Sequence, residues 1–270
     1  MTVSPRPPAL LAASKGLREA RMSRRISLRK LATKLGFHPQ NLSLLETGGR
    51  APTETDAAWM LGFLRVSLEE YQRIMELVRH CNDSEFVEPV DSTADPLLWT
   101  LERRSSRILE WAPRILPDLL QDFTYTRATL SSERDIDIEV FQRRVRQDVL
   151  SGEHGNQHLF LLGEAALVGG PASPPVPQDQ LHHLRSLASR NTVAIRIVPA
   201  DAGPCRLIDP FTVFEDEERR PTVALRHHHS NLYVTSSPLA GRYRETIDQL
   251  RRVALDASAS LDFLQRLGNG

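Results

Sequence analysis

The segment from Ile26 to Gly48 constrains the fold of this chain more than any other stretch. Its first half carries an apolar stripe at spacings of i, i+3, i+4 and i+7, formed by Leu28, Leu31, Ala32 and Leu35. This period predicts an amphipathic helix that begins near Ser27. Gly36 stands where the helix must end, because a residue without Cβ adopts the left-handed conformation at little cost. Pro39 then suits the first turn of a second helix, where its missing N–H group is no loss.

The second helix is expected to bury one face and expose a polar one. Leu42 and Leu45, three residues apart, would anchor it against the rest of a helical bundle. The opposite face carries Gln40, Asn41 and Ser43. A helix-turn-helix places base-reading groups in a major groove by this arrangement: a helix, a glycine turn and a second helix whose amides face outward. The segment therefore predicts DNA binding.

The charges of the chain are unevenly distributed. The net charge is zero, which by itself gives no reason to expect a nucleic-acid partner. However, residues 1–80 hold 13 Lys and Arg against 7 Asp and Glu, and residues 81–270 hold 21 against 27. A basic N-terminal module favours phosphate binding, because counterion release depends on local contacts rather than on the charge of the whole chain. The alternative is a charged face that only interacts with solvent.

Cysteine content and hydropathy indicate a cytoplasmic protein. Cys81 and Cys205 are too few for a disulfide framework, and we expect both thiols to be reduced. No apolar run approaches the roughly 18 residues of a membrane helix. The apolar stretch near the N-terminus is too short for a signal peptide. We therefore expect a cytoplasmic location and no membrane partner.

The chain is long enough for two domains, and its pattern of apolar and polar residues changes after residue 81. Residues 1–81 predict a five-helix bundle that contains the helix-turn-helix, with a first helix over Leu10–Arg21. Capping boxes at Thr53 and Ser67 would open its last two helices. Residues 82–95 read as a linker because Pro, Asp, Ser and Glu interrupt the pattern. Residues 96–270 favour an α+β domain.

The predicted C-terminal domain mixes helices with short β-rich runs. The helices are expected at Leu97–Leu109, Asp135–Leu150 and Leu239–Leu255. The strands are expected at Leu159–Leu162, Val193–Val198, Phe211–Phe214, Thr222–Leu225 and Leu232–Thr235. The chain is thus predicted to combine an all-α N-terminal domain with a mixed α+β C-terminal domain.

Six residues are candidates for contact with DNA. Gln40 and Asn41 can each form two hydrogen bonds with adenine, and a good pair discriminates between bases by about 1–3 kcal/mol. Ser43 is assigned a phosphate or incidental contact. The side chains that would bind phosphates without reading sequence are Arg29, Lys30 and Arg50. A polar helix start in a helical pair that does not bind DNA is the alternative. We expect Glu46 to form a structural ion pair with Arg18.

Metal binding and catalysis have no comparable support in the sequence. The run His227-His228-His229 would alternate between two faces of a strand and cannot easily converge on one ion. Glu164 admits a catalytic role, but a carboxylate in such a segment more often caps or pairs within the fold. Phosphate-binding loops, nucleophile elbows and zinc-protease motifs are absent from the sequence. We expect no enzyme activity, no catalytic residues, no cofactor and no metal.

Two regions of the chain resemble a known family. Residues 10–65 resemble the Xre-type, lambda-repressor-like helix-turn-helix, including Leu17-Arg18-Glu19 and Glu46-Thr-Gly48. The remainder resembles the C-terminal domain of a large actinobacterial group of such regulators. The matching segments are 110–121, 141–144, 163–167, 191–199 and 243–251. The resemblance implies an antitoxin-like C-terminal domain, in proteins often encoded beside small partner proteins and active in development or antibiotic control.

Three hypotheses follow for the function. The first is a sequence-specific transcriptional regulator that binds a double-stranded DNA operator as a homodimer, because one such module reads too few base pairs for useful specificity. Its C-terminal domain would dimerise and receive a signal or a small partner protein encoded nearby. The second is an antitoxin-like protein whose main role is to bind a small toxin-like partner. The third is an enzyme or ligand sensor built on the α+β half.

Overall fold

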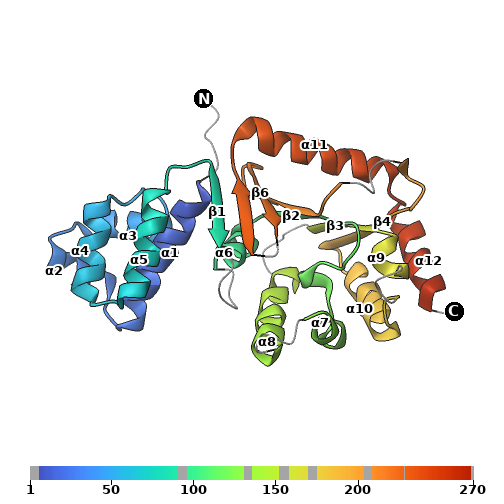
Figure 1. Ribbon diagram of the computed structural model, residues 1–270, viewed down its shortest axis with the longest axis horizontal. Helices are drawn as coiled ribbons and strands as arrows, with labels where there is room; N and C mark the ends of the chain where they lie inside the picture. Colours follow the sequence, from blue (N-terminus) through green and yellow to red (C-terminus); the bar gives the residue numbers. More distant parts are fainter. Residues whose placement is uncertain are drawn as a thin grey trace. The chain divides into compact units, whose positions relative to one another are not determined.

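The computed structural model describes residues 6–89, 96–130, 136–151, 158–169, 175–203, 208–227 and 229–268 (Figure 1). Contacts within the chain divide it into two units. The first comprises residues 1–87 and 233–236, and the second comprises residues 88–232 and 237–270. In the described ranges, no helix is both long enough and apolar enough to span a membrane.

Five helices make up most of the first unit. They are α1 (Pro8–Ser23), α2 (Leu28–Leu35), α3 (Pro39–Thr47), α4 (Glu54–Leu64) and α5 (Leu68–Arg79). α1 packs against α3, α4 and α5, and α2 packs against α3. Apolar side chains without solvent exposure fill the space between the helices, among them Leu17, Leu31, Leu42, Met60 and Ile74. The predicted five-helix bundle is confirmed.

The capping residues of the last two helices behave differently from each other. Thr53 and Asp56 form the predicted capping box, since the Asp56 N–H donates to Thr53 Oγ1 at 3.0 Å and the Thr53 N–H donates to Asp56 Oδ2 at 3.5 Å. At the next helix, Ser67 Oγ accepts from the Glu70 N–H at 3.1 Å. The Glu70 carboxylate is instead 3.4 Å from the Arg24 guanidinium. The expected full capping box at Ser67 is therefore wrong in its second half.

The second unit is built mainly around a mixed β-sheet, and residues 85–87 and 233–234 of its strands are counted with the first unit. The strands are β1 (Glu85–Pro89), β2 (Arg107–Ala112), β3 (His158–Gly163), β4 (Val193–Val198), β5 (Phe211–Glu215), β6 (Pro221–Arg226) and β7 (Ser230–Val234). They form a seven-stranded sheet of order β1-β7-β6-β5-β2-β3-β4. β3 runs parallel to β2 and β4, whereas β5 runs antiparallel to β2 and β6. This mixed sheet confirms the predicted fold class.

Helices cover the sheet of the second unit. They are α6 (Pro96–Arg104), α7 (Phe123–Thr129), α8 (Ile136–Arg146), α9 (Ala165–Val168), α10 (Gln178–Ala188), α11 (Ser237–Val253) and α12 (Ala257–Gly268). Figure 1 shows α11 on one side of the sheet and α7, α8 and α10 on the other. Every residue of β3 is buried, as expected for a central parallel strand covered on both faces.

Two of the predicted helix ranges end too late. The expected helix Leu97–Leu109 stops at Arg104, where Ser105 Oγ donates to the Leu101 carbonyl at 2.6 Å. Its last predicted residues belong to β2, because Ile108 and Leu109 enter the middle of the sheet. The expected helix Asp135–Leu150 is regular only over α8 and continues as a 3-10 helix over Gln147–Ser151. Within the expected linker 82–95, residues 85–89 form strand β1.

Candidate nucleic-acid interface

The turn between α2 and α3 has the geometry that the sequence predicts. Ser27 caps α2 by accepting a hydrogen bond from the Lys30 N–H at 3.3 Å. Gly36 ends the helix in the left-handed conformation, with φ of 71°. The Phe37 N–H then donates back to the Ala32 carbonyl at 2.9 Å. This wrapped helix end reverses the chain within three residues and brings α3 against α2.

α3 begins and ends at well-defined caps. His38 Nδ1 accepts from the Gln40 N–H at 3.3 Å, and Pro39 occupies the first helical position. At the other end, Gly48 has φ of 71° and its N–H donates to the Leu44 carbonyl. The Gly49 N–H also donates to that carbonyl, at 2.9 Å. Because both ends are fixed, the side chains of this short helix have defined directions.

The face of α3 that is exposed to solvent contains the predicted reading residues. Gln40 and Asn41 are exposed and Ser43 is half-buried, whereas Leu42 and Leu45 are buried as predicted. At 100° per residue, Gln40, Leu44 and Thr47 lie within about 60° of one another at the centre of this face. Leu44 is 38% exposed and so adds an apolar side chain to this face.

The sequence reasoning missed Leu44 and Thr47, although their spacing from Gln40 contains the necessary signal. Positions i, i+4 and i+7 lie on one face of a helix, so the exposed amide at position 40 predicts exposure at 44 and 47. Thr47 Oγ1 donates to the Ser43 carbonyl at 2.8 Å. The face therefore consists of an amide pair, a hydroxyl group and one apolar side chain.

The outward face of α2 is basic. Arg29 and Lys30 are both exposed, as is Lys34, which the sequence reasoning did not single out. Arg50 is exposed just after α3, and its backbone N–H donates to the Leu44 carbonyl at 3.2 Å. Four cations thus lie on or directly after the two helices of the predicted motif.

Glu46 does not add a negative charge to this surface. Its carboxylate is buried, with a side chain 2% exposed, and accepts hydrogen bonds from Arg21 Nε at 2.6 Å and Arg21 Nη2 at 2.7 Å. The hydrogen bond to Glu46 raises the pKa of Arg21, so the guanidinium stays charged at any physiological pH. Glu46 is the sole carboxylate between residues 20 and 50. The exposed charges of this segment are therefore all positive.

The predicted ion pair between Arg18 and Glu46 is wrong. Arg18 is exposed on α1, whereas Arg21 lies one helical turn later and reaches Glu46. Arg21 also donates from Nη1 to the Ile26 carbonyl at 2.8 Å. The role expected of the pair, joining α1 to α3, is carried out by Arg21.

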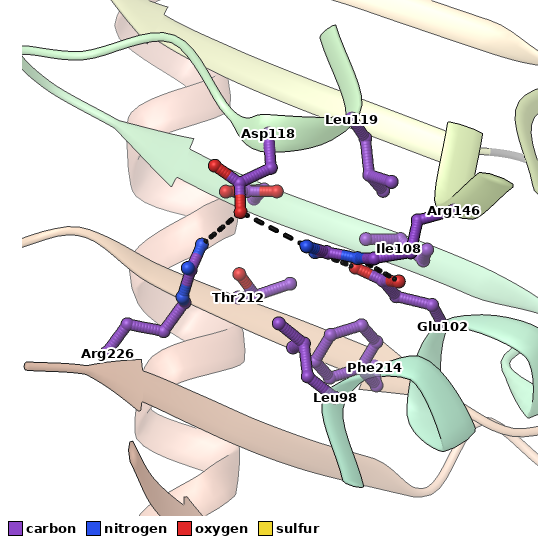
Figure 2. Close-up of a pocket in the computed structure, with 10 residues that line it drawn as sticks. Leu98, Glu102, Ile108, Asp118, Leu119, Arg146, Thr212, Phe214 and Arg226 are labelled. Carbon is purple, nitrogen blue, oxygen red and sulfur yellow. Dashed lines mark hydrogen bonds and ion pairs between the residues drawn. The ribbon is translucent and has the colours of Figure 1, made fainter. Parts of the chain in front are cut away.

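A second polar cluster lies in the C-terminal unit, where α6 and α8 meet the sheet (Figure 2). Asp118 Oδ2 accepts from Arg226 Nη1 at 2.8 Å and from Arg146 Nη1 at 3.3 Å. Arg143 Nη1 is 3.1 Å from Asp118 Oδ1. Arg146 also binds the Glu102 carboxylate through two parallel hydrogen bonds of 2.6 and 2.9 Å. The elements that carry these residues are thus joined by a network of charged hydrogen bonds.

The pKa values of two carboxyl groups here, Glu110 and Asp118, shift in opposite directions. Burial, together with the neighbouring Asp118 carboxylate, raises the pKa of Glu110 to about 8. Burial also acts to raise the pKa of Asp118, but Arg226, Arg143 and Arg146 outweigh it and keep that pKa well below its usual range. The cavity among these side chains has a volume of about 10 Å³, which admits at most one water molecule. The cluster therefore has no room for a substrate.

The metal candidates from the sequence gain no support. Across the ranges that the structure covers, no group of three or more His, Cys, Asp or Glu side chains is arranged to bind a metal ion. His228 of the histidine run, and the thiol of Cys205, lie outside the described residues. Glu164 Oε2 accepts from the Ala200 N–H at 2.8 Å, a pairing within the fold of the kind that the sequence favours.

Comparison with known families separates the two halves of the chain. Residues 17–71 match a family model described as helix-turn-helix, the kind of module that binds DNA. Residues 96–266, more than half of the chain, match the model of DUF5753, a domain of unknown function. The chain belongs to the DUF5753 family. Neither model names a catalytic activity. In this DUF5753 protein, a helix-turn-helix therefore precedes the family domain.

Other comparisons add little about this DUF5753 protein. No curated protein matches the chain. A solved structure of TrmBL2, an archaeal chromatin protein with a novel mode of DNA binding, is similar with a TM-score of 0.35 and 11% sequence identity. The similarity covers 81% of this chain and 71% of that chain. A TM-score of this size carries no information about function.

Proposed function

We propose that this DUF5753 protein is a sequence-specific DNA-binding transcriptional regulator. One observation supports the proposal: α3 exposes the side-chain amides of Gln40 and Asn41 next to a surface whose exposed charges are all cationic. The single carboxylate in that segment, Glu46, is buried against Arg21. A surface of this kind attracts phosphates over its whole extent and offers hydrogen-bonding groups at its centre.

In the proposed complex, α3 enters the major groove through its N-terminal residues. Gln40 and Asn41 pair with adenine through N6 and N7, and Leu44 contacts a thymine methyl group. Arg29, Lys30 and Arg50 bind phosphates on either side of the groove and set the register without reading sequence. Lys34 adds a further phosphate contact on α2.

The finer proposal concerns assembly. We infer that the protein acts as a homodimer, because a single module of this type contacts too few base pairs, and two modules on adjacent half-sites double the number read. The C-terminal domain then provides dimerisation and receives a signal or a small partner protein. Operator binding also requires a cytoplasmic protein in a bacterial cell.

The experiment is a selection of duplexes from a random DNA library by the full-length protein, followed by affinity measurement on the enriched sequence. We expect enrichment of one motif, with half-sites about one helical turn apart. The Gln40→Ala/Asn41→Ala variant should lose about tenfold or more in preference for the motif over scrambled DNA. Gln72→Ala is the matched control, since Gln72 is an exposed amide on α5.

Two outcomes would reject the proposal. One is a selection that enriches no motif. The other is a Gln40→Ala/Asn41→Ala variant that keeps the affinity and the preference of the wild type. A small protein that co-purifies from the native host, combined with weak affinity for any duplex, would favour the antitoxin-like alternative instead.

A further inference from the structure

A cavity in the C-terminal domain lies beside α7 and α8, which pack against each other (Figure 1). Its volume is about 470 Å³, within the range of about 300–1,000 Å³ that is typical of small-molecule sites. The residues that line it come from α7, α8 and the segments next to them. The cavity is separate from the Asp118 cluster, whose own space admits at most one water molecule.

The walls of this cavity are mostly apolar and include two exposed aromatic rings. Phe123, the first residue of α7, is 61% exposed, and Phe141 on α8 is 68% exposed. Thr126 and Val140 line the cavity and are buried. Exposed large apolar side chains around a concave surface mark binding sites more often than isolated surface residues do. The phenyl rings that α7 and α8 contribute to the cavity therefore offer apolar surface to an aromatic or aliphatic group.

The polar groups of the cavity leave one positive charge without a partner. Asp137 pairs with Arg127 at 2.7 Å, and Asp122 accepts the Tyr125 N–H at 2.7 Å as the cap of α7. Arg143 donates to Gln121 Oε1 at 2.5 Å. Arg144 lines the cavity, is exposed, and forms no ion pair with any residue that the structure describes. Among the charged side chains that line the cavity, Arg144 is thus the one that neither a hydrogen bond nor an ion pair engages within the described residues.

We propose that this cavity binds a small amphipathic anion, with its apolar group between Phe123 and Phe141 and its anionic group on Arg144. The chemical class is an aromatic or aliphatic carboxylate, sulfonate or phosphate small enough for about 470 Å³. The size of the cavity fits a small molecule rather than a folded partner. This inference does not depend on DNA binding.

The test uses two fluorescent probes that differ in charge. Anilinonaphthalene sulfonate carries an aromatic system and one anion, and phenylnaphthylamine carries the aromatic system alone. Each is titrated into the folded full-length protein without DNA. We expect saturable binding of one sulfonate per chain, about threefold tighter or more than that of the neutral probe.

Two variants locate the site. Phe141→Ala should weaken binding of both probes by about fivefold or more, because it removes one apolar wall. Arg144→Gln should weaken binding of the sulfonate by about two- to fivefold and leave the neutral probe unchanged. The matched controls are Phe63→Ala, an exposed ring on α4, and Arg252→Gln, an exposed arginine on α11. Thermal denaturation of each variant checks that it is folded.

Three outcomes would overturn the proposal. The first is binding of the sulfonate that does not saturate. The second is an effect of Phe63→Ala as large as that of Phe141→Ala, which would place the probe elsewhere. The third is an Arg144→Gln variant that affects neither probe or both equally, which would mean that the cavity does not recognise an anion.

Discussion

The guanidinium of Arg21 and the carboxylate of Glu46 face each other through two parallel hydrogen bonds of 2.6 and 2.7 Å. A further N–H group of Arg21 donates to the Ile26 carbonyl, just before α2. One side chain of α1 thereby holds α3 in position and also holds the segment that leads into α2. The direction of the exposed face of α3 depends on this pair, although neither residue belongs to that face.

Replacing Arg21 by Met should destabilise the N-terminal bundle. The variant leaves the Glu46 carboxylate buried without a partner, so we expect a loss of about 3 kcal/mol in the free energy of opening of α3. Hydrogen–deuterium exchange of peptides covering residues 39–47 measures this free energy in the full-length protein. The Arg21→Met/Glu46→Leu double variant should recover most of the loss, because no unpaired charge remains.

Arg18→Met is the control for this pair. Arg18 is exposed on α1, and we expect its replacement to change the free energy by less than about 0.5 kcal/mol. An Arg18 variant as unstable as the Arg21 variant would contradict this geometry.

The two glycines that end α2 and α3 should differ in their tolerance of a methyl group. Gly36 has φ of 71°, and a Cβ added there would have no atom within 4 Å, so Gly36→Ala should cost about 1 kcal/mol in free energy of unfolding from backbone strain alone. Gly48 has the same φ, and its Cβ would lie 3.3 Å from Leu11 Cδ2. We therefore expect Gly48→Ala to cost about 2 kcal/mol.

Gly62 supplies a control of opposite sign. It lies within α4, has no left-handed φ and has open space around its Cβ position. Gly62→Ala should raise the free energy of unfolding by up to about 1 kcal/mol, because alanine loses less backbone freedom in a helix. The same hydrogen-exchange experiment measures all three variants. Equal losses at all three positions would reject the assigned conformations.

Much of the N-terminal bundle could be predicted because its information is local. Apolar spacing, the cap at Ser27, the glycine at 36 and the proline at 39 each act within one or two helical turns. The choice between Arg18 and Arg21 as the partner of Glu46 could not be made in this way. Both lie on α1, and only the packing of α1 against α3 decides which one reaches the carboxylate.

The C-terminal domain was harder to predict because its elements depend on distant partners. The residues of β2 continue an apolar helical pattern, and they become a strand only because β3 and β5 flank them in the sheet. The charge cluster was also missed, since Glu102, Asp118, Arg146 and Arg226 come from separate parts of the sequence.

Glu110 should make stability depend on pH in an identifiable way. Its pKa is about 8 in the folded protein and near the ordinary value of 4.5 when unfolded. A raised folded pKa means that the folded state binds the proton more tightly. This contribution to stability is complete below about pH 4.5 and is lost as pH rises through about 8.

The comparison of Glu110→Gln with the wild type isolates this group from all others. Glutamine imitates the protonated acid, so the two proteins should have similar free energies of unfolding near pH 5. Near pH 8 the variant should be more stable by about 2 kcal/mol, less than the full pKa shift implies, because the Glu110 side chain is half-buried and solvent screens part of its charge. Urea denaturation at several pH values gives the difference. A difference that does not change between these pH values would mean that Glu110 ionises normally.

The basic face of α2 should determine the salt dependence of DNA binding. In the proposed complex, Arg29 and Lys30 each neutralise one phosphate. Arg29→Gln/Lys30→Gln should then reduce the slope of log K against log salt by about 1.8, since each phosphate contact contributes about 0.9. Fluorescence anisotropy of a labelled duplex at several salt concentrations measures the slope. The affinity should fall on the selected motif and on scrambled DNA alike, because phosphate contacts carry no sequence information.

Arg73→Gln/Arg252→Gln removes the same net charge from exposed positions on α5 and α11 and should leave the slope unchanged. If this control lowers the slope as much as the α2 variant does, the protein responds to its overall charge, and the assignment of α2 to the phosphate backbone is wrong.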